Sequence, residues 1–230
     1  MQQLNILDIP FQFGDVQDHI YPVLLLGTED LVLVDCGYIG FLPQIEEAVR
    51  KAGFDCKQIT KLLLTHHDHD HMGTAAAFKQ KYPDVHILAG RKEIPFITGQ
   101  RKSPRLEQAE VLQEHLPPEQ QAFGEVFIHL LKSLEPVQVD AALNEGDTFD
   151  WAGGCVILET PGHTPGHVSL YLKGAQTVIT GDAAVLEHGQ LAVANPQFTL
   201  NFVQAQASLN RLQALKAETY VCYHGGKLLC

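Results

Sequence analysis

Short apolar runs rich in Val, Ile and Leu recur along the whole chain, separated by polar segments with Gly, Pro and Asp. Runs of this length and composition, bounded by residues that favour turns, are typical of β-strands. The pattern predicts strands at Leu4–Ile9, Tyr21–Leu26, Leu31–Val34, Lys61–Thr65, Val85–Leu88, Cys155–Thr160, Val168–Leu172, Thr177–Thr180 and Thr219–Tyr223.

Apolar residues at helical spacing predict helices at Leu42–Ala52, Met72–Lys81 and Phe202–Lys216. In front of the third segment, Asn201 with Gln204 resembles a capping box. Strands that alternate with helices in this way indicate an α/β domain whose sheets are covered by helices.

The stretch from Arg91 to Pro136 has a different composition, rich in Gln, Glu and Leu and interrupted by Pro104, Pro117 and Pro118. We interpret it as a helical insertion at 91–136 in a single domain that spans 1–230, since no linker separates two parts. We expect the insertion to cover the functional edge of the fold and to line a pocket. The lining residues expected there are Phe96, Ile97, Leu112 and Phe123.

Composition and charge limit the class of substrate and the location that can be expected. The formal net charge of the 230 residues is −11, which disfavours nucleic acid and favours a small-molecule substrate. The basic cluster of Arg101, Lys102 and Arg105 fits a solvated loop or helix start. No run is long enough to cross a membrane and no signal peptide is recognisable, so a cytoplasmic protein without a membrane partner is expected. The sequence does not indicate an oligomeric state.

The first candidate metal-binding residues follow the apolar run Lys61–Thr65. Six consecutive residues, His66–His71, have the sequence His-His-Asp-His-Asp-His. Imidazole and carboxylate are the usual protein ligands of zinc, iron and manganese. An apolar strand that delivers such a cluster therefore predicts a metal site.

Three more apolar runs end in a single metal-ligand type beside glycine: Gly162-His163, Gly181-Asp182 and His224-Gly225. Ligands of layered α/β folds gather outside the carboxyl ends of the strands. Alone, Asp182 could be a turn residue and either histidine a surface residue. Together the strand ends predict one shared site.

These motifs resemble those of the metallo-β-lactamase superfamily. Thr65–Gly73 resembles its H-x-H-x-D-H signature, and Thr160–His167 its T-P-G-H-T-P-G-H segment. Thr180-Gly181-Asp182 is similar to its T-G-D, His224-Gly225 to its terminal H-G, and Asp35-Cys36-Gly37 to its early D-x-G motif.

The resemblance implies an αβ/βα sandwich, in which two facing sheets carry helices outside and two metal ions at one edge. Carried over position by position, one metal takes His66, Asp68 and His163, and the other takes Asp70, His71 and His224. Asp182 bridges both. The implied nucleophile is a hydroxide between the metals, with Asp70 as the catalytic residue that orients it and receives its proton. Asp35 is expected to support the metal loop.

One position departs from the signature: Asp68 stands where the second histidine is usual, so the motif is H-x-D-x-D-H. An additional carboxylate makes the donor set harder and favours manganese or iron(II) more than an all-imidazole set does. The expected cofactor is two divalent metal ions, with Zn²⁺ the first choice and Mn²⁺ or Fe²⁺ the alternatives. His167 is expected to be structural, and His67 and His69 to point away from the metals.

The resulting hypothesis is a metal-dependent hydrolase that acts on a small ester, lactone or thioester. Two alternatives stay open, a non-haem iron oxidase or dioxygenase of the same fold and a metal-binding regulatory protein without catalysis. The substrate and the native metal are not indicated by the sequence.

Overall fold

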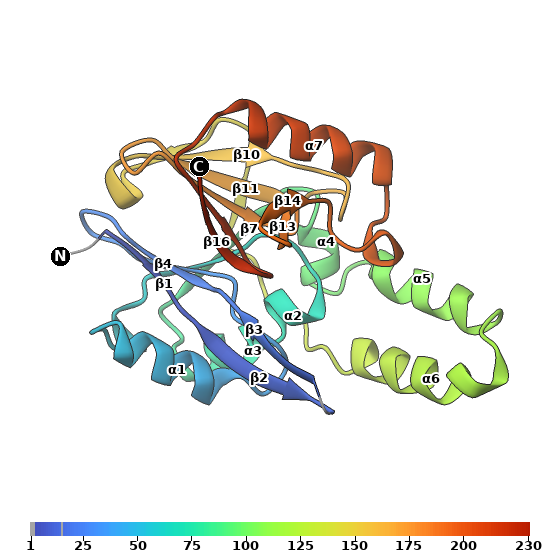
Figure 1. Ribbon diagram of the computed structural model, residues 1–230. Helices are drawn as coiled ribbons and strands as arrows, with labels where there is room; N and C mark the ends of the chain where they lie inside the picture. The colour runs from blue at the N-terminus through green and yellow to red at the C-terminus, as the bar shows by residue number, and fades with distance from the viewer. Residues whose placement is uncertain (1–2, 15) are drawn as a thin grey trace.

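A computed structural model describes residues 3–14 and 16–230 of the chain. Two mixed six-stranded sheets face each other and form the centre of the molecule (Figure 1). The first has the order β1-β4-β5-β6-β7-β8 and the second β16-β15-β12-β11-β10-β9. Strands of the first sheet are β1 (Leu4–Ile6), β4 (Val23–Leu26), β5 (Leu31–Val34), β6 (Lys61–Leu64), β7 (His86–Gly90) and β8 (Ala141–Leu143). Strands of the second are β9 (Thr148–Phe149), β10 (Cys155–Glu159), β11 (Val168–Leu172), β12 (Thr177–Gly181), β15 (Thr219–Cys222) and β16 (Gly226–Leu229).

The strand β5 shows why the sequence folds into layers. All four of its residues are buried, because both faces of the sheet are covered. Successive side chains of a strand point to opposite faces. Accordingly, Leu31 and Leu33 belong to the core beneath the helices, whereas Val32 and Val34 belong to the core between the two sheets.

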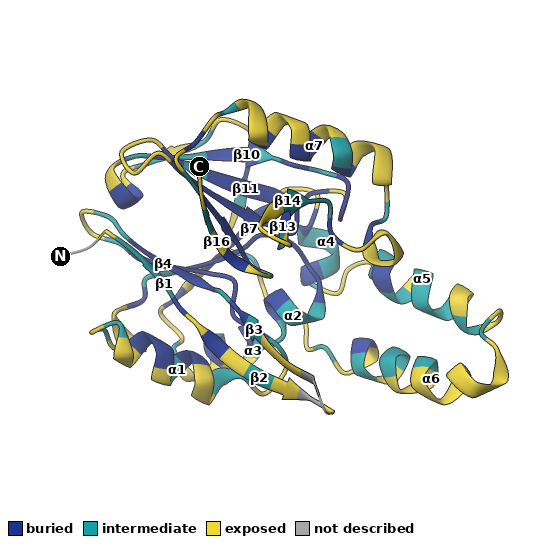
Figure 2. Ribbon diagram, viewed as in Figure 1, coloured by how far each residue is buried: buried dark blue, intermediate teal, exposed yellow. Residues whose placement is uncertain are grey.

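Helices cover the outer face of each sheet. α1 (Leu42–Lys51) and α3 (Ala75–Lys81) pack on the first sheet through buried residues such as Ile45 and Phe78. α7 (Phe202–Ala214) covers the second sheet through Leu209 and Leu212. Figure 2 shows buried strands between helices whose outer faces are exposed. This arrangement confirms the predicted αβ/βα sandwich.

The shorter and more exposed elements were not predicted from the sequence. They are the hairpin of β2 (Ile9–Phe13) with β3 (Val16–Ile20), the hairpin of β13 (Val185–Glu187) with β14 (Gln190–Ala192), and the edge strands β8, β9 and β16. The predicted strand Leu4–Ile9 ends at Ile6, and its last residue begins β2. The predicted helix Met72–Lys81 corresponds to α3 from Ala75 onward, whereas Met72 is the last residue of α2 (His69–Met72).

Between β7 and β8 the chain forms α4 (Ile94–Ile97), α5 (Pro104–Gln113) and α6 (Pro118–Lys132). α5 and α6 lie side by side and extend from the rest of the molecule (Figure 1). Short 3₁₀ turns occur at Cys56–Gln58, Trp151–Gly153 and Pro196–Phe198. Within the described residues, no helix is both long and apolar enough to cross a lipid bilayer.

Candidate metal centre

Four loops that follow the carboxyl ends of strands bring the predicted ligands together. The loop after β6 and the helix α2 that follows it carry His66–His71. β10, β12 and β15 lead to His163, Asp182 and His224. Because β6 belongs to the first sheet and the other three strands to the second, the cluster lies across both sheets. All seven residues proposed from the sequence are members of it.

We define the first position as the set His66, Asp68 and His163, all of which are buried. Asp68 Oδ2 lies 3.0 Å from His163 Nε2 and 3.7 Å from His66 Nε2. Ligands about 2.0–2.1 Å from a tetrahedral ion are separated by roughly 3.3 Å. The spacing of the first position therefore fits a single divalent ion.

We define the second position as the set Asp70, His71 and His224. Asp70 Oδ2 lies 3.1 Å from His224 Nε2 and 3.9 Å from His71 Nε2. The side chains of Asp70 and His224 are 14% and 27% exposed, whereas that of His71 is fully buried. This position thus faces the opening of the site.

The carboxylate of Asp182 spans the two positions. Its Oδ1 lies 3.3 Å from His71 Nε2 and 3.7 Å from His224 Nε2, both in the second position. Its Oδ2 lies 3.4 Å from His163 Nε2, in the first. One carboxylate thus offers an oxygen to each position, which is the geometry of a bridging ligand.

Buried polar atoms without partners mark the centre of the cluster. His66 Nε2, His71 Nε2 and Asp182 Oδ1 are inaccessible to solvent and have no hydrogen-bond partner among the described residues. Such atoms are costly unless a bound group satisfies them. Because imidazole nitrogens and carboxylate oxygens are ligands of Zn²⁺, Mn²⁺ and Fe²⁺, the residues present fit a divalent metal centre.

The carboxyl groups of the cluster are held in the charged form. Burial raises the pKa of Asp68, but Arg105 and His163 outweigh burial and hold this pKa well below its usual range. Burial likewise raises the pKa of Asp182, and the charge of His71 is the largest of the effects that lower it well below the usual value. Both side chains therefore present negative charge to a cation at neutral pH.

Asp35, immediately after β5, supports the loop as the sequence suggested. Its Oδ2 accepts hydrogen bonds from Thr65 Oγ1 at 2.8 Å and from His71 Nδ1 at 2.9 Å, and its Oδ1 accepts one from the Thr65 amide at 2.8 Å. With the Nδ1 proton so engaged, the Nε2 lone pair of His71 is directed to the metal position.

His67 points away from the cluster and binds a buried carboxylate, Glu93. The glutamate contacts both His67 Nδ1 and the His67 amide, the latter at 3.1 Å. Its other oxygen accepts hydrogen bonds from Thr164 Oγ1 at 2.9 Å and from the Gly166 amide at 2.6 Å. Glu93 thus joins the loop after β6 to the loop after β10, a role that no sequence motif indicated.

His167 also serves the backbone and not the metal positions. Its Nε2 accepts a hydrogen bond from the Asp182 amide at 2.9 Å, and its Nδ1 lies 2.9 Å from Thr160 Oγ1. Gly181 stands beside it at φ 51, where a Cβ would lie 2.6 Å from His167 Nε2. Glycine is therefore required there to bring Asp182 into place.

Tyr223 is buried beneath the loop. Its hydroxyl donates a hydrogen bond to the Asp70 carbonyl oxygen at 2.7 Å, and its ring lies 3.9 Å from that of His71. The tyrosine therefore packs against the ligand loop and does not extend into open space.

The segment 91–136, interpreted above as an insertion, approaches the site through other residues than those expected. Phe127 of α6 lies 5.6 Å from His69, ring to ring. Leu112 and Phe123 do not fit the expectation, because they are 49% and 64% exposed. The expectation was also wrong for Ile97, which is fully buried in the core under the helices.

Phe96 lies 4.9 Å from the His67 ring, on the side away from the ligands. α4 has only four residues and α6 is mostly exposed, so neither leaves an apolar period from which these orientations can be read.

The interpretation of Arg105 as a solvated residue was also wrong. Arg105 is 2% exposed, and its Nη2 donates to Asp68 Oδ2 at 2.7 Å. Arg101, in the same basic cluster, is exposed and lies over the ring of Phe96. Arg105 could have been predicted from Asp68, because a buried carboxylate of this kind needs a positively charged partner.

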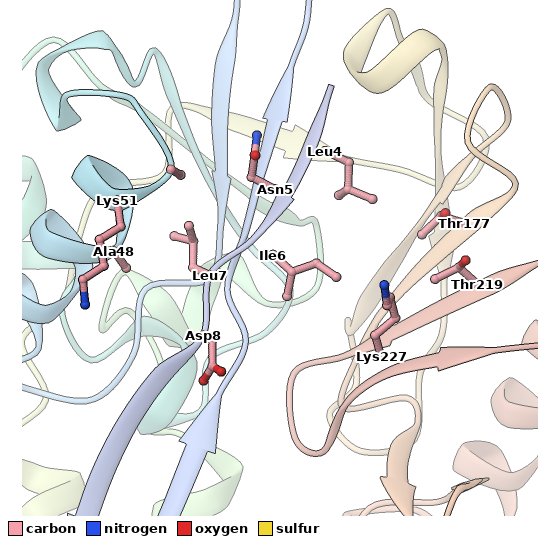
Figure 3. Close-up of a pocket in the computed structure, with 11 residues that line it drawn as sticks. Leu4, Asn5, Ile6, Leu7, Asp8, Ala48, Lys51, Thr177, Thr219 and Lys227 are labelled. Atoms are coloured by element: carbon pink, nitrogen blue, oxygen red, sulfur yellow. The ribbon is translucent and has the colours of Figure 1, made fainter. Parts of the chain in front are cut away.

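A groove of about 570 Å³ lies elsewhere, at the opposite ends of the strands (Figure 3). Leu4 and Ile6 line it from β1, and Thr177 and Thr219 from the beginnings of β12 and β15. No histidine or cysteine of the described chain lines it. The groove therefore contains none of the residues of the candidate metal centre.

Comparison with known proteins gives a consistent result. A family model described as the metallo-beta-lactamase superfamily matches residues 17–224. A protein of Bacillus subtilis (strain 168) named "Probable metallo-hydrolase YflN" is 26% identical over 212 residues, which are 84% of this chain and 75% of that protein. A hydroxyacylglutathione hydrolase of Ruegeria pomeroyi is 29% identical over 180 residues, 77% of this chain and 51% of that enzyme.

A second hydroxyacylglutathione hydrolase, from Fuscovulum blasticum, is 28% identical over 72% of this chain and 48% of its own length. The chain thus spans about half the length of these two enzymes. Among solved structures, a metallo-beta-lactamase family protein of Thermus thermophilus matches with a TM-score of 0.73 and 24% identity. The match covers 100% of this chain and 75% of that one, and it shows the shared fold.

Proposed function

Because the chain belongs to the metallo-beta-lactamase superfamily and is a metal-dependent hydrolase, we propose that it cleaves a small carboxylic ester, lactone or thioester at a centre of two divalent metal ions. The observation that carries the proposal is the position of Asp182, whose two oxygens face different ligand sets. Seven ligand side chains exceed what one tetrahedral ion uses. Zn²⁺ is the proposed metal, and Mn²⁺ and Fe²⁺ are the alternatives.

Bound at such a centre, divalent ions supply an activated water and polarise the oxygen of the bond to be cleaved. His66, Asp68 and His163 would hold one ion and Asp70, His71 and His224 the other, with Asp182 between them. The ionised carboxylates offset much of the added positive charge.

Asp70 is the proposed catalytic residue. Its carboxylate is the most exposed of the three in the cluster, with 14% of the side chain accessible. Burial raises its pKa, and His71 and His69 outweigh burial to lower it. The residue is therefore ionised at neutral pH and can orient the attacking water. Its proposed role as proton acceptor rests on its exposed position, since a lowered pKa weakens a base.

The substrate class rests on chemistry and on the named activity of relatives. The net charge of −11 disfavours polyanionic substrates. Two of the relatives are named for hydrolysis of hydroxyacylglutathione, an acyl group joined to a thiol compound. These names favour hydrolysis over iron-dependent oxidation.

The test is a rate comparison on purified protein reconstituted with Zn²⁺, Mn²⁺ or Fe²⁺. An acylglutathione thioester, an acyl-homoserine lactone and a simple aryl ester represent the three bond types. We expect one class to be cleaved with turnover that is lost in the presence of a chelator and in Asp182→Asn. The proposal is wrong if none of the three is cleaved faster by the reconstituted protein than by the metal-free protein.

A further inference from the structure

Arg105 places a fixed positive charge at one side of the candidate metal centre. The residue lies in the first turn of α5, and its side chain is 3% exposed. Nη2 and Nε donate to Asp68 Oδ2 at 2.7 Å and 3.2 Å. Nη1 donates to Gln108 Oε1 at 2.6 Å, and Nη2 also contacts the Phe198 carbonyl oxygen. The guanidinium is thus enclosed by protein groups and is not free to bind a substrate.

The oxygen that Arg105 uses is the one that the first position needs. Asp68 Oδ2 faces His163 Nε2 at 3.0 Å, and Arg105 Nη2 lies 3.5 Å from that same nitrogen. A metal ion that binds His66, Asp68 and His163 would therefore lie close to a guanidinium that is always protonated.

Among the described residues, no arginine or lysine pairs with the carboxylates of the second position. Asp70 is paired with His71, His69 and His224 only, and Asp182 with His71, His163 and His224 only, among the ion pairs of the described residues. Arg105 therefore makes the centre electrostatically asymmetric.

We infer that Arg105 makes the two metal positions unequal, so that the second position fills first and the first position binds a divalent ion more weakly. The inference rests on the proposed function, because it assumes that both positions bind metal. Its physical basis is repulsion between two cations in a buried site, where the effective dielectric constant is far below that of water.

The charge count supports the same conclusion. Asp68 contributes −1 and Arg105 contributes +1, so the pair adds the same charge as a neutral histidine would. The carboxylate therefore does not give the first position the additional attraction for a cation that it would give alone. In the metal-free protein the guanidinium supplies Asp68 with the positive charge that a metal would otherwise supply.

The experiment is a Zn²⁺ titration of the chelator-stripped full chain by calorimetry, with bound zinc counted by elemental analysis. We expect two dissociation constants for the parent protein. In Arg105→Met the weaker constant should tighten by about tenfold or more, since a repulsive unit charge is removed. The tighter constant should change little. Arg101→Met is the matched control, because it removes an exposed charge of the same insertion.

A second variant, Arg105→Gln, keeps hydrogen-bond donors beside Asp68 and guards against misfolding of the methionine variant. It should tighten the weaker constant in the same way if charge is the cause. The inference is overturned if the parent binds two ions with equal affinity, or if both variants leave the weaker constant unchanged. It is also overturned if they weaken it, since Arg105 would then hold Asp68 in place for the metal. The titration needs no substrate, so failure of the hydrolysis assay does not affect it.

Discussion

Asp35 accepts a hydrogen bond from His71, a proposed metal ligand, and we expect this bond to orient its ring. Asp35 adopts φ 59, a conformation that asparagine accepts more readily than most residues. Asp35→Asn should therefore preserve the fold while it removes the charge that faces His71 Nδ1. We expect zinc affinity at the second position to fall by about 10–100-fold, measured by competition with a chromophoric chelator. Asp84→Asn, at an exposed site, is the control, and equal affinities in both variants would exclude this role for Asp35.

Glu93 is a fully buried carboxylate whose loss leaves several donors without an acceptor. The acid also balances His67: burial lowers the pKa of that histidine, and Glu93 outweighs burial to raise it. Glu93→Ala should lower the free energy of unfolding by about 3–5 kcal/mol, measured by urea denaturation of the metal-free protein. The exposed Glu125→Ala should change it little, and a similar result for both would contradict a structural role for Glu93.

Some residues of the site could be proposed from the sequence and others could not. His66, Asp182 and His224 could be proposed because each follows an apolar strand directly, so that local order places it at the sheet edge. Glu93 and Arg105 could not, because their partners lie 26 and 37 residues away in the chain. Only the packing of the insertion against the metal loop brings them together.

Among the elements, the turn between β4 and β5 is tied to the second sheet through Asp30. The carboxylate accepts hydrogen bonds from Thr60 Oγ1 at 2.9 Å and from Trp151 Nε1 at 3.0 Å, and it pairs with Lys61. Burial raises the pKa of Asp30, but the bonds to Lys61, Trp151 and Thr60 outweigh it, so the folded pKa lies below the usual value.

A depressed folded pKa gives stability that is present above the unfolded pKa of about 3.9 and lost as the pH falls through the folded value. Asp30→Asn should therefore lower the free energy of unfolding by about 1–2 kcal/mol at pH 7. The difference from the parent should shrink as the pH falls below about 4. Urea denaturation at several pH values measures it, with the exposed Glu29→Gln as control. A difference that does not depend on pH would exclude the ionised carboxylate as its source.

Besides Arg105, the α5–α6 hairpin places an aromatic residue, Phe127, beside His69. Phe127 lies 6.2 Å from Phe198 and also faces His69, ring to ring. Phe127→Ala should raise KM for the best substrate of the panel several-fold and change the melting temperature little, because few core contacts are lost. The exposed Phe123→Ala on the same helix should have no effect on either quantity. Equal KM values in both variants would show that α6 does not shape the substrate site.

Element prediction succeeded where burial is complete on both faces. β5, β6 and β12 read as continuous apolar runs because helices cover one side and the opposite sheet the other. β3 has the sequence Val-Gln-Asp-His-Ile, and β16 alternates buried and exposed residues, so neither resembles such a run. These edge elements are defined by pairing with a neighbour, which the linear pattern does not contain.

At the scale of the whole molecule, each metal position draws ligands from both sheets. His66 and Asp68 follow β6 of the first sheet, and His163 follows β10 of the second. Likewise His71 lies in α2, which follows β6 of the first sheet, and His224 follows β15 of the second. An ion at either position would therefore act as a cross-link between the two layers.

Because the ligands come from both sheets, we expect a metal ion to bind late in folding. Neither sheet alone holds a complete ligand set, so high-affinity binding must wait until the two layers have docked, and long-range contacts of this kind form slowly. In refolding with Co²⁺, the absorbance of the bound ion should appear together with the slowest protein phase and never ahead of it. When the free ion concentration is a hundred times its dissociation constant, binding should add about 2.7 kcal/mol to the free energy of unfolding. Metal binding would then be the last step of folding, and the bound ion would stabilise the contact between the two sheets.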